Sequence, residues 1–270
     1  MLGRLIRTEL NEIRQSNRLV RNVSRLRARK RRCRPDATES EIDMTPKQIF
    51  ITGASGFIGH ALASELLARG HAVSALTRPG SESKVPTGCR IVHGDALDSS
   101  SYAVQVSPAD TFVHLVGVGH PSPSKGAEFR SVDLQSVRQA VPAAAQADVG
   151  HFVYLSVARP APIMREYQIV RAEGECLITQ AGLNATFVRP WYVLGPGRRW
   201  PMALIPMYAV ARLFPATRDG AIRLALVTRD QIVRSMVWAI ENPAEGVRAL
   251  EPPDIRRGGQ IELALSHHAA

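Results

Sequence analysis

Short apolar runs alternate with longer amphipathic stretches between residues 48 and 189 of the chain. A short apolar run bounded by turn residues is typical of a buried strand, and apolar positions three and four apart are typical of a helix. The pattern predicts strands at 48–52, 71–76, 89–93, 111–116, 151–156 and 184–189. It predicts helices at 60–69, 128–147 and 167–181, the first of them ended by Gly70.

This alternation predicts an α/β fold in which helices cover both faces of a doubly wound parallel sheet. After the sixth strand, the sequence predicts a strand or loop at 224–228, a helix at 230–241 and a last short strand at 246–251. The expected organisation is a basic arm and linker at 1–46, a core at 47–197, a small apolar lobe at 198–257 and a loose tail at 258–270.

Three glycines, Gly53, Gly56 and Gly59, lie where the first strand meets the first helix. Glycines at such a junction permit a tight turn, a close approach of the backbone to a pyrophosphate, and close packing of the helix on the strand. The amino end of the helix adds N–H groups and the positive end of its dipole. The junction therefore predicts a dinucleotide-binding site.

The residues after the second strand indicate which dinucleotide binds. An acidic residue at this point usually accepts a ribose 2′-hydroxyl, and Leu76-Thr-Arg-Pro-Gly-Ser81 contains none. Arg78 is instead suited to pair with a 2′-phosphate. The segment favours NADP(H), with NAD(H) as the alternative.

The net charge of +10 and the pI of about 10.2 raise the question of nucleic-acid binding. Residues 1–43 hold 12 Lys and Arg against six Asp and Glu, so six of the ten charges belong to the arm. The core is only mildly basic, and we expect no specific nucleic-acid partner. Three hypotheses remain for the arm: a segment that contacts membranes or an anionic partner, a targeting presequence, or residues upstream of a start at Met44.

Composition excludes several other classes of protein. Apolar stretches are interrupted well before the roughly 20 residues that a membrane span needs. Three scattered cysteines and dispersed histidines fit neither a disulfide framework nor a metal site. These features favour a cytoplasmic protein without a metal. The expected oligomeric state is a monomer or a homodimer. Contact with the inner face of a membrane, through the arm or residues 198–215, is a further hypothesis.

The turn Thr52-Gly-Ala-Ser-Gly-Phe-Ile-Gly59 resembles that of extended and atypical short-chain dehydrogenases/reductases, including epimerase/dehydratase-like and nitrogen-metabolite-regulator-like members. The resemblance extends over residues 47–250 and implies a Rossmann-type core with a small C-terminal substrate lobe. It also implies an adenine contact at Asp95 and Ala96, and a loop after the sixth strand that covers the nicotinamide. The expected cofactor-binding residues are Gly53, Ala54, Ser55, Gly56, Phe57, Ile58, Gly59, Arg78, Asp95, Ala96, Leu115, Val116, Gly117, Pro190, Trp191, Tyr192 and Val193.

The same resemblance implies a catalytic Tyr, a Lys four residues later and a Ser at the end of the fifth strand. Tyr167 and Ser156 match, but Arg171 occupies the Lys position. Arginine keeps the charge yet is bulkier, has donors in a planar fork and cannot relay a proton. The two hypotheses are an active oxidoreductase and a cofactor-sensing or accessory protein; a nucleotide-sugar epimerase or dehydratase is third. Glu173 and Glu175 are expected on the helix surface without a catalytic role.

The segment 200–215 is apolar and rich in Met and aromatic residues. A site for sugars would carry more polar side chains, so the sequence predicts an apolar small-molecule substrate such as an isoprenoid, a quinone or a steroid. A lid over that substrate, a membrane contact and a buried helix are the alternatives for this segment. Residues from the loop after the fourth strand are expected to border the same cleft: Ser122, Ser124 and Lys125.

Overall fold

The computed structural model describes residues 45–197, 203–204, 211 and 214–258. The predictions for the basic arm, for most of the apolar segment 198–215 and for the C-terminal tail concern residues outside these ranges.

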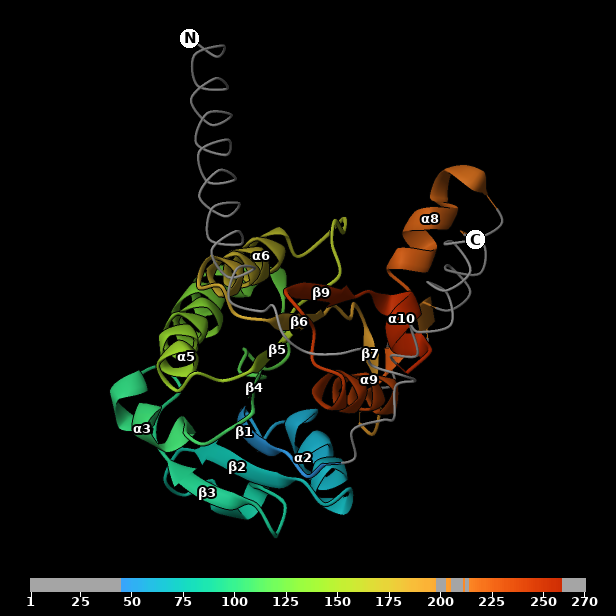
Figure 1. The fold of residues 1–270 in the computed structure, drawn as a ribbon. Helices are drawn as coiled ribbons and strands as arrows, with labels where there is room; N and C mark the ends of the chain where they lie inside the picture. Colours follow the sequence, from blue (N-terminus) through green and yellow to red (C-terminus); the bar gives the residue numbers. More distant parts are fainter. Residues whose placement is uncertain (1–44, 198–202, 205–210, 212–213, 259–270) are drawn as a thin grey trace, which may run out of the picture. The chain divides into compact units, whose positions relative to one another are not determined.

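A parallel sheet forms the centre of the described fold, and its strand order is β3-β2-β1-β4-β5-β6-β9 (Figure 1). These strands are β1 (Gln48–Thr52), β2 (Ala72–Thr77), β3 (Arg90–His93), β4 (Thr111–His114), β5 (His151–Leu155), β6 (Ala185–Val188) and β9 (Val247–Leu250). The strand order reverses between β1 and β4, as in a doubly wound sheet. The predicted α/β fold is confirmed, and each predicted strand of the core lies within a residue or two of its expected place.

Helices connect successive strands. The longer ones are α2 (Gly59–Ala68), α5 (Gln135–Gln146), α6 (Arg165–Gln180), α8 (Pro215–Arg223) and α9 (Arg229–Glu241). Shorter helices are α3 (Ala103–Val106), α4 (Gly126–Glu128), α10 (Pro252–Arg256), the 3-10 turns Glu82–Lys84, Ser99–Ser101 and Pro123–Lys125, and the π-helix η4 (Phe129–Leu134). The single helix expected at 128–147 therefore contains a π-helical segment before α5. Two short strands, β7 (Val193–Leu194) and β8 (Val227–Thr228), pair beside the main sheet.

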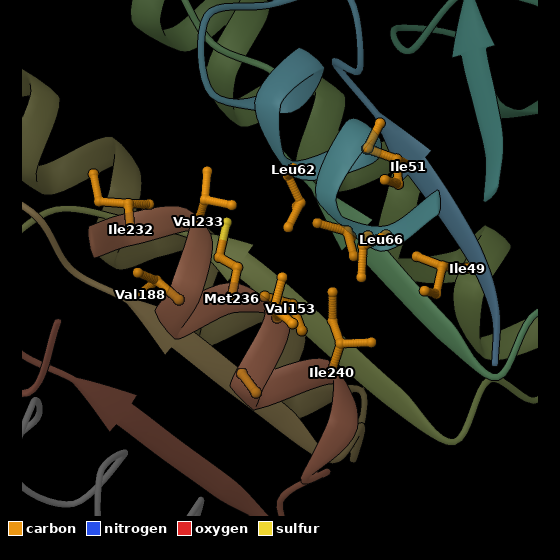
Figure 2. Close-up of a cluster of buried hydrophobic side chains, with 14 of the residues drawn as sticks. Ile49, Ile51, Leu62, Leu66, Val153, Val188, Ile232, Val233, Met236 and Ile240 are labelled. Atoms are coloured by element: carbon orange, nitrogen blue, oxygen red, sulfur yellow. The ribbon is translucent and has the colours of Figure 1, made fainter. Parts of the chain in front are cut away.

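One face of the sheet packs against α2 and α9 (Figure 2). Leu62 and Leu66 of α2 meet Met236 and Ile240 of α9, and all four side chains are fully buried. Strand residues such as Val153 close the cluster from the sheet side. Burial of this kind stabilises by about 1.5–3 kcal/mol for each large side chain, so the two helices are fixed on the sheet.

The opposite face packs against α3, α5 and α6. Aromatic side chains dominate it: the rings of Phe50 and Phe112 lie 5.2 Å apart, and those of Phe112 and Phe152 lie 5.1 Å apart. Tyr154 continues the row and is fully buried. Helices thus cover both faces of the sheet, and the ends of its strands remain for binding.

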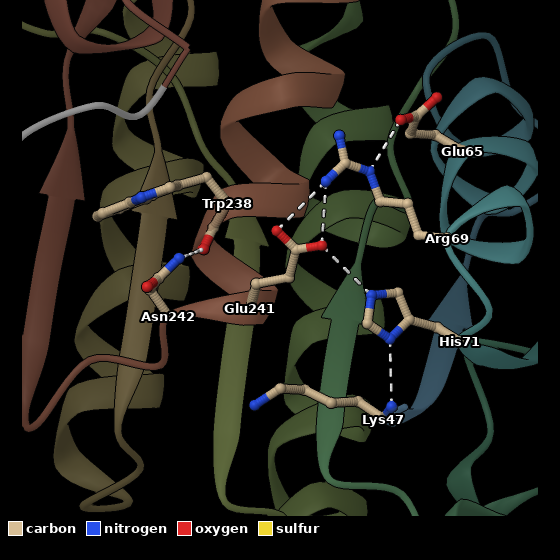
Figure 3. A network of polar contacts seen from close by, with 7 residues as sticks. All are labelled: Lys47, Glu65, Arg69, His71, Trp238, Glu241 and Asn242. Atoms are coloured by element: carbon tan, nitrogen blue, oxygen red, sulfur yellow. Dashed lines mark hydrogen bonds and ion pairs between the residues drawn. The ribbon is translucent and has the colours of Figure 1, made fainter. Parts of the chain in front are cut away.

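A polar network ties α2 to α9 near the start of the parallel strands (Figure 3). Arg69 pairs with Glu65 at 2.9 Å and with Glu241 at 3.2 Å. The backbone N–H of Lys47 donates to Nδ1 of His71, so Nε2 of that ring carries the proton and faces Glu241 at 3.4 Å.

Among the described residues, no helix has the length and apolar character needed to cross a membrane.

Candidate functional site

The strand register brings the predicted site residues to one edge of the sheet. Thr52, the last residue of β1, is paired with Leu76 and His114. Arg78 follows two residues after Leu76, and Leu115 directly follows His114. The register of the other strands places the remaining predicted segments at this same carboxyl edge: Asp95, Gly117, Ser156 and Pro190. Ligands of doubly wound folds bind at this edge, beside the reversal of strand order.

The glycine turn has the geometry that a bound pyrophosphate needs. Gly53 has φ +82°, a conformation that favours glycine, and a Cβ there would lie 3.0 Å from the carbonyl carbon of Leu115. A Cβ at Gly59 would overlap the carbonyl oxygen of Gly53, and one at Gly56 would lie 3.2 Å from that oxygen. Ile58, the N-cap residue of α2, has no side-chain hydrogen bond to the first turn. This cradle fits a dinucleotide cofactor.

Two residues predicted to contact the adenosine, Arg78 and Asp95, follow the carboxyl ends of β2 and β3. Arg78 is exposed beyond β2, as a partner for a 2′-phosphate must be. Asp95 is exposed after β3, and its Oδ1 accepts a hydrogen bond from the backbone N–H of Leu97 at 3.0 Å. Leu115 and Val116 are partly buried, between the glycine turn and the end of β4.

Arg171 lies beneath the loop after β4 and is only 3% exposed. Its guanidinium donates to Asp133 Oδ1 at 2.6 Å and to the carbonyl oxygen of Leu155 at 2.9 Å. A Cβ at Gly117 would overlap this guanidinium, so Gly117 leaves room for it. Burial alone would lower the pKa of Arg171, but Tyr167, Tyr154 and Asp133 together raise it. The side chain stays charged and connects the ends of β4 and β5 to α6 and η4.

Tyr167 lies one turn before Arg171 on α6 and is partly buried. Its ring is 5.1 Å from the Arg171 guanidinium carbon and 5.0 Å from the ring of Phe129. The positive charge predicted beside Tyr167 is therefore present in its surroundings. The Arg171 guanidinium lies over the face of the Tyr167 ring, and the Asp133 carboxylate balances its charge.

Ser156 is buried, and its hydroxyl donates to Glu175 at 2.6 Å. Glu175 is 4% exposed and also pairs with Arg159 and, at 2.6 Å, with Arg189. The expectation that Glu175 is a surface carboxylate is wrong, because the ends of β5 and β6 pack over this side of α6. Glu173, by contrast, is exposed to solvent in part and pairs with Arg138 on the outer side of α5.

A directional chain of hydrogen bonds runs beneath the cradle. Ser136 donates its hydroxyl proton to the carbonyl oxygen of Asp133, so its oxygen accepts from Nε2 of His114 at 3.1 Å. Nδ1 of His114 is then the acceptor for the hydroxyl of Thr52 at 2.8 Å. Burial, followed by the charge of Arg171, lowers the pKa of His114 to about 3. The ring is therefore neutral, and it links the glycine turn to the Arg171 side of the site.

Two contributors to this site, Asp133 and His114, are not predicted from the sequence. His114 is one of several dispersed histidines, and no motif surrounds Asp133. The feature that could have identified Asp133 is its place on a helix beside the apolar residues Leu134 and Val137, which are buried. Such a residue needs a cationic partner.

The predicted nicotinamide wall lies in the loop after β6. Trp191 and Tyr192 have rings 5.5 Å apart, and both are partly buried. The backbone carbonyl oxygen of Tyr192 accepts a hydrogen bond from Val227 N at 3.0 Å, which fixes the loop to the C-terminal part of the chain.

In the loop after β4, Lys125 donates to the carbonyl oxygen of Gly119 at 3.0 Å, and the hydroxyls of Ser122 and Ser124 lie 2.8 Å apart. That Ser122, Ser124 and Lys125 border the substrate cleft stays a prediction.

Residues 53–198, more than half of the chain, match a family described as NAD(P)H-binding. The chain belongs to this family. The match confirms the prediction of an NAD(P)-binding protein and agrees with the resemblance to short-chain dehydrogenases/reductases.

Several relatives carry the names of redox enzymes. A 3-diazoavenalumate denitrifying reductase from Streptomyces sp is 28% identical over 226 residues, 74% of each chain. A 3-beta-hydroxysteroid dehydrogenase from Mycolicibacterium neoaurum is 31% identical over 115 residues, 40% of this chain and 31% of the relative. Among solved structures, the Bordetella bronchiseptica enzyme WbmH in complex with NAD+ is similar, with TM-score 0.58 and 22% identity over 76% of this chain and 75% of that one. This similarity shows that the two proteins share a fold.

Proposed function

We propose that the protein transfers hydride between NADP(H) and a carbonyl or alcohol carbon of an apolar small molecule. The observation that carries the proposal is the glycine cradle of a NAD(P)H-binding family member, at the same sheet edge as Tyr167 and the aromatic loop after β6. Solvent-exposed Arg78, with no acidic residue in its segment, supports NADP(H) over NAD(H).

When held by the turn from Gly53 to Gly59, the dinucleotide would supply the hydride that reduces the substrate carbonyl. Tyr167 donates its phenolic proton to the carbonyl oxygen, which becomes the alcohol, and solvent restores that proton. Arg171 supports this step from the face of the Tyr167 ring, where its charge favours electron density that builds on the phenol oxygen. Trp191 and Tyr192 exclude water from the reacting atoms.

An apolar substrate agrees with the aromatic character of the loop at Trp191 and Tyr192. The relative named as a hydroxysteroid dehydrogenase is consistent with such a substrate class. A panel of ketosteroids, quinones and isoprenoid aldehydes is therefore the first set to assay for NADPH oxidation, with UDP-glucose included as the polar comparison.

Calorimetric titration with NADPH and NADH tests the cofactor. We expect wild-type protein to bind NADPH more tightly, and Arg78→Ala to remove the preference while NADH affinity is unchanged. Arg90→Ala removes an exposed arginine of β3, hydrogen-bonded to Ser74 and to the Gln105 carbonyl oxygen, and is the matched control. Absence of binding by either nucleotide would overturn the proposal.

A second function, binding of cofactor for sensing without turnover, is favoured by one specific observation. The hydroxyl of Ser156 and the guanidinium of Arg171 are both buried and engaged by carboxylates. For the active enzyme we expect Tyr167→Phe to abolish turnover of a reactive substrate while NADPH affinity stays within about twofold. Tight NADPH binding with no turnover on the whole panel supports the sensing function instead.

A further inference from the structure

Phe57 connects the glycine turn to two segments far away in the sequence. Its ring packs against the backbone of Gly195, where an added Cβ would lie 2.5 Å from Cζ of the ring. The same Cβ would lie 3.3 Å from Cβ of Arg229. The glycine turn, the loop at the end of β7 and the start of α9 therefore meet at this ring.

Arg229, the first residue of α9, places its guanidinium over the Phe57 ring, with Cζ 5.4 Å from the ring centroid. The ring holds the cation through its negative face and limits the positions that the long side chain samples. Phe57 itself lies two residues before Gly59, where α2 begins. The cation is thereby fixed beside the amino end of α2, which is the end that binds the pyrophosphate.

The charge of Arg229 remains available to a ligand. Its ion pair with Asp230 uses Nε at 3.2 Å, and the Asp230 side chain is 69% exposed, so water and salt weaken this pair. Within the described part of the chain, the two terminal nitrogens of the guanidinium donate no hydrogen bond. The Arg229 side chain is 28% exposed, which leaves these donors accessible.

We propose that Arg229 is an additional cofactor-binding residue, held on the Phe57 ring so that its guanidinium donates to the pyrophosphate of the dinucleotide. The inference rests on cofactor binding at the glycine cradle, the basis of the proposed function. It assigns to Arg229 a different part of the ligand from Arg78: the pyrophosphate is common to NADPH and NADH, whereas the 2′-phosphate belongs to NADPH alone. The two arginines therefore make separable predictions.

The test is a calorimetric titration of NADPH, NADH and ADP-ribose into wild type, Arg229→Gln and Arg234→Gln. Arg234 is an exposed arginine on the same helix and serves as the matched control. We expect Arg229→Gln to weaken all three ligands by a similar factor of about ten, because one charge-assisted hydrogen bond is lost. Arg234→Gln should bind as wild type does.

Two more variants keep the result interpretable. Arg229→Lys retains a charge and should recover part of the affinity, and Phe57→Leu removes the ring and should lose part of it; thermal unfolding of each variant verifies its fold. If wild type binds none of the three ligands, the proposed function fails. If wild type binds and folded Arg229→Gln binds equally well, or loses affinity for NADPH alone, only the assignment of Arg229 is overturned.

Discussion

At the scale of single residues, the site depends on two buried charges that each have a matched partner. Arg171 is held by Asp133, and Glu175 is held by Arg189 and Arg159. A buried pair adds little net stability, but removal of one partner leaves an uncompensated charge. The forked donors of Arg171 serve two acceptors at once: Nη1 donates to the Leu155 carbonyl oxygen and Nη2 to Asp133.

Arg171→Met is therefore expected to lower the free energy of unfolding by about 3–5 kcal/mol, because Asp133 is left buried without a cation. Arg138→Met provides the contrast, since the Arg138–Glu173 pair is exposed and should cost less than about 1 kcal/mol. Urea unfolding of both variants measures the difference. Equal losses in the two variants would contradict the role given to Asp133.

Gly59→Ala is expected to abolish measurable NADPH binding, since its methyl group would overlap the Gly53 carbonyl and force the cradle open. Gly220→Ala is the control, because among the described residues no atom of another segment lies within 4 Å of a Cβ there. Nucleotide titration by fluorescence compares the two proteins. Retained NADPH affinity in a folded Gly59→Ala protein would show that the turn does not hold the cofactor.

At the scale of elements, α9 links the core to the C-terminal part of the chain. Its inner side packs against α2 and the sheet, and its first residue, Arg229, stacks on the glycine turn. The start of α9 is fixed by a capping box: Thr228 accepts from the N–H of Gln231, whose side chain in turn accepts from Thr228 N. The position of Arg229 thus depends on a local cap as well as on packing.

Thr228→Ala is expected to lower the free energy of unfolding by about 1 kcal/mol, the usual cost of a lost N-cap. Thr228→Ser keeps the hydroxyl and should remain close to wild type. Thermal or urea unfolding of both variants measures the effect. If Arg229 binds the pyrophosphate, Thr228→Ala should also weaken NADPH by a few-fold, whereas an unchanged affinity would show that the cap does not position that side chain.

At the scale of the whole molecule, two buried histidines couple stability to pH. Burial lowers the pKa of both His114 and His151 to about 3, and a neighbouring arginine adds to the effect in each case. The unfolded chain protonates these rings below a pH of about 6.5, whereas the folded chain keeps them neutral. The unfolded state therefore binds more protons between these values, and stability falls as the pH falls.

Between pH 7 and pH 5, each of these histidines is expected to remove about 2 kcal/mol from the free energy of unfolding. Urea titrations at the two pH values measure the loss. His151→Gln, which keeps a polar group near Thr186, should lose less stability on acidification than wild type, and the exposed His60→Gln should behave as wild type. Identical pH dependence in all three proteins would contradict the buried neutral state.

The sequence by itself determined the strands, the α/β class, the glycine turn and the edge at which the site lies. These features depend on local periodicity and on backbone conformations that glycine alone adopts easily, so neighbouring residues are enough to predict them. Only the tertiary structure decided that Glu175 is buried, that Arg171 is neutralised by Asp133, and that Arg229 lies on Phe57. The partners in these contacts are separated by many positions along the chain, and whether a polar side chain on a helix is buried depends on what packs over it.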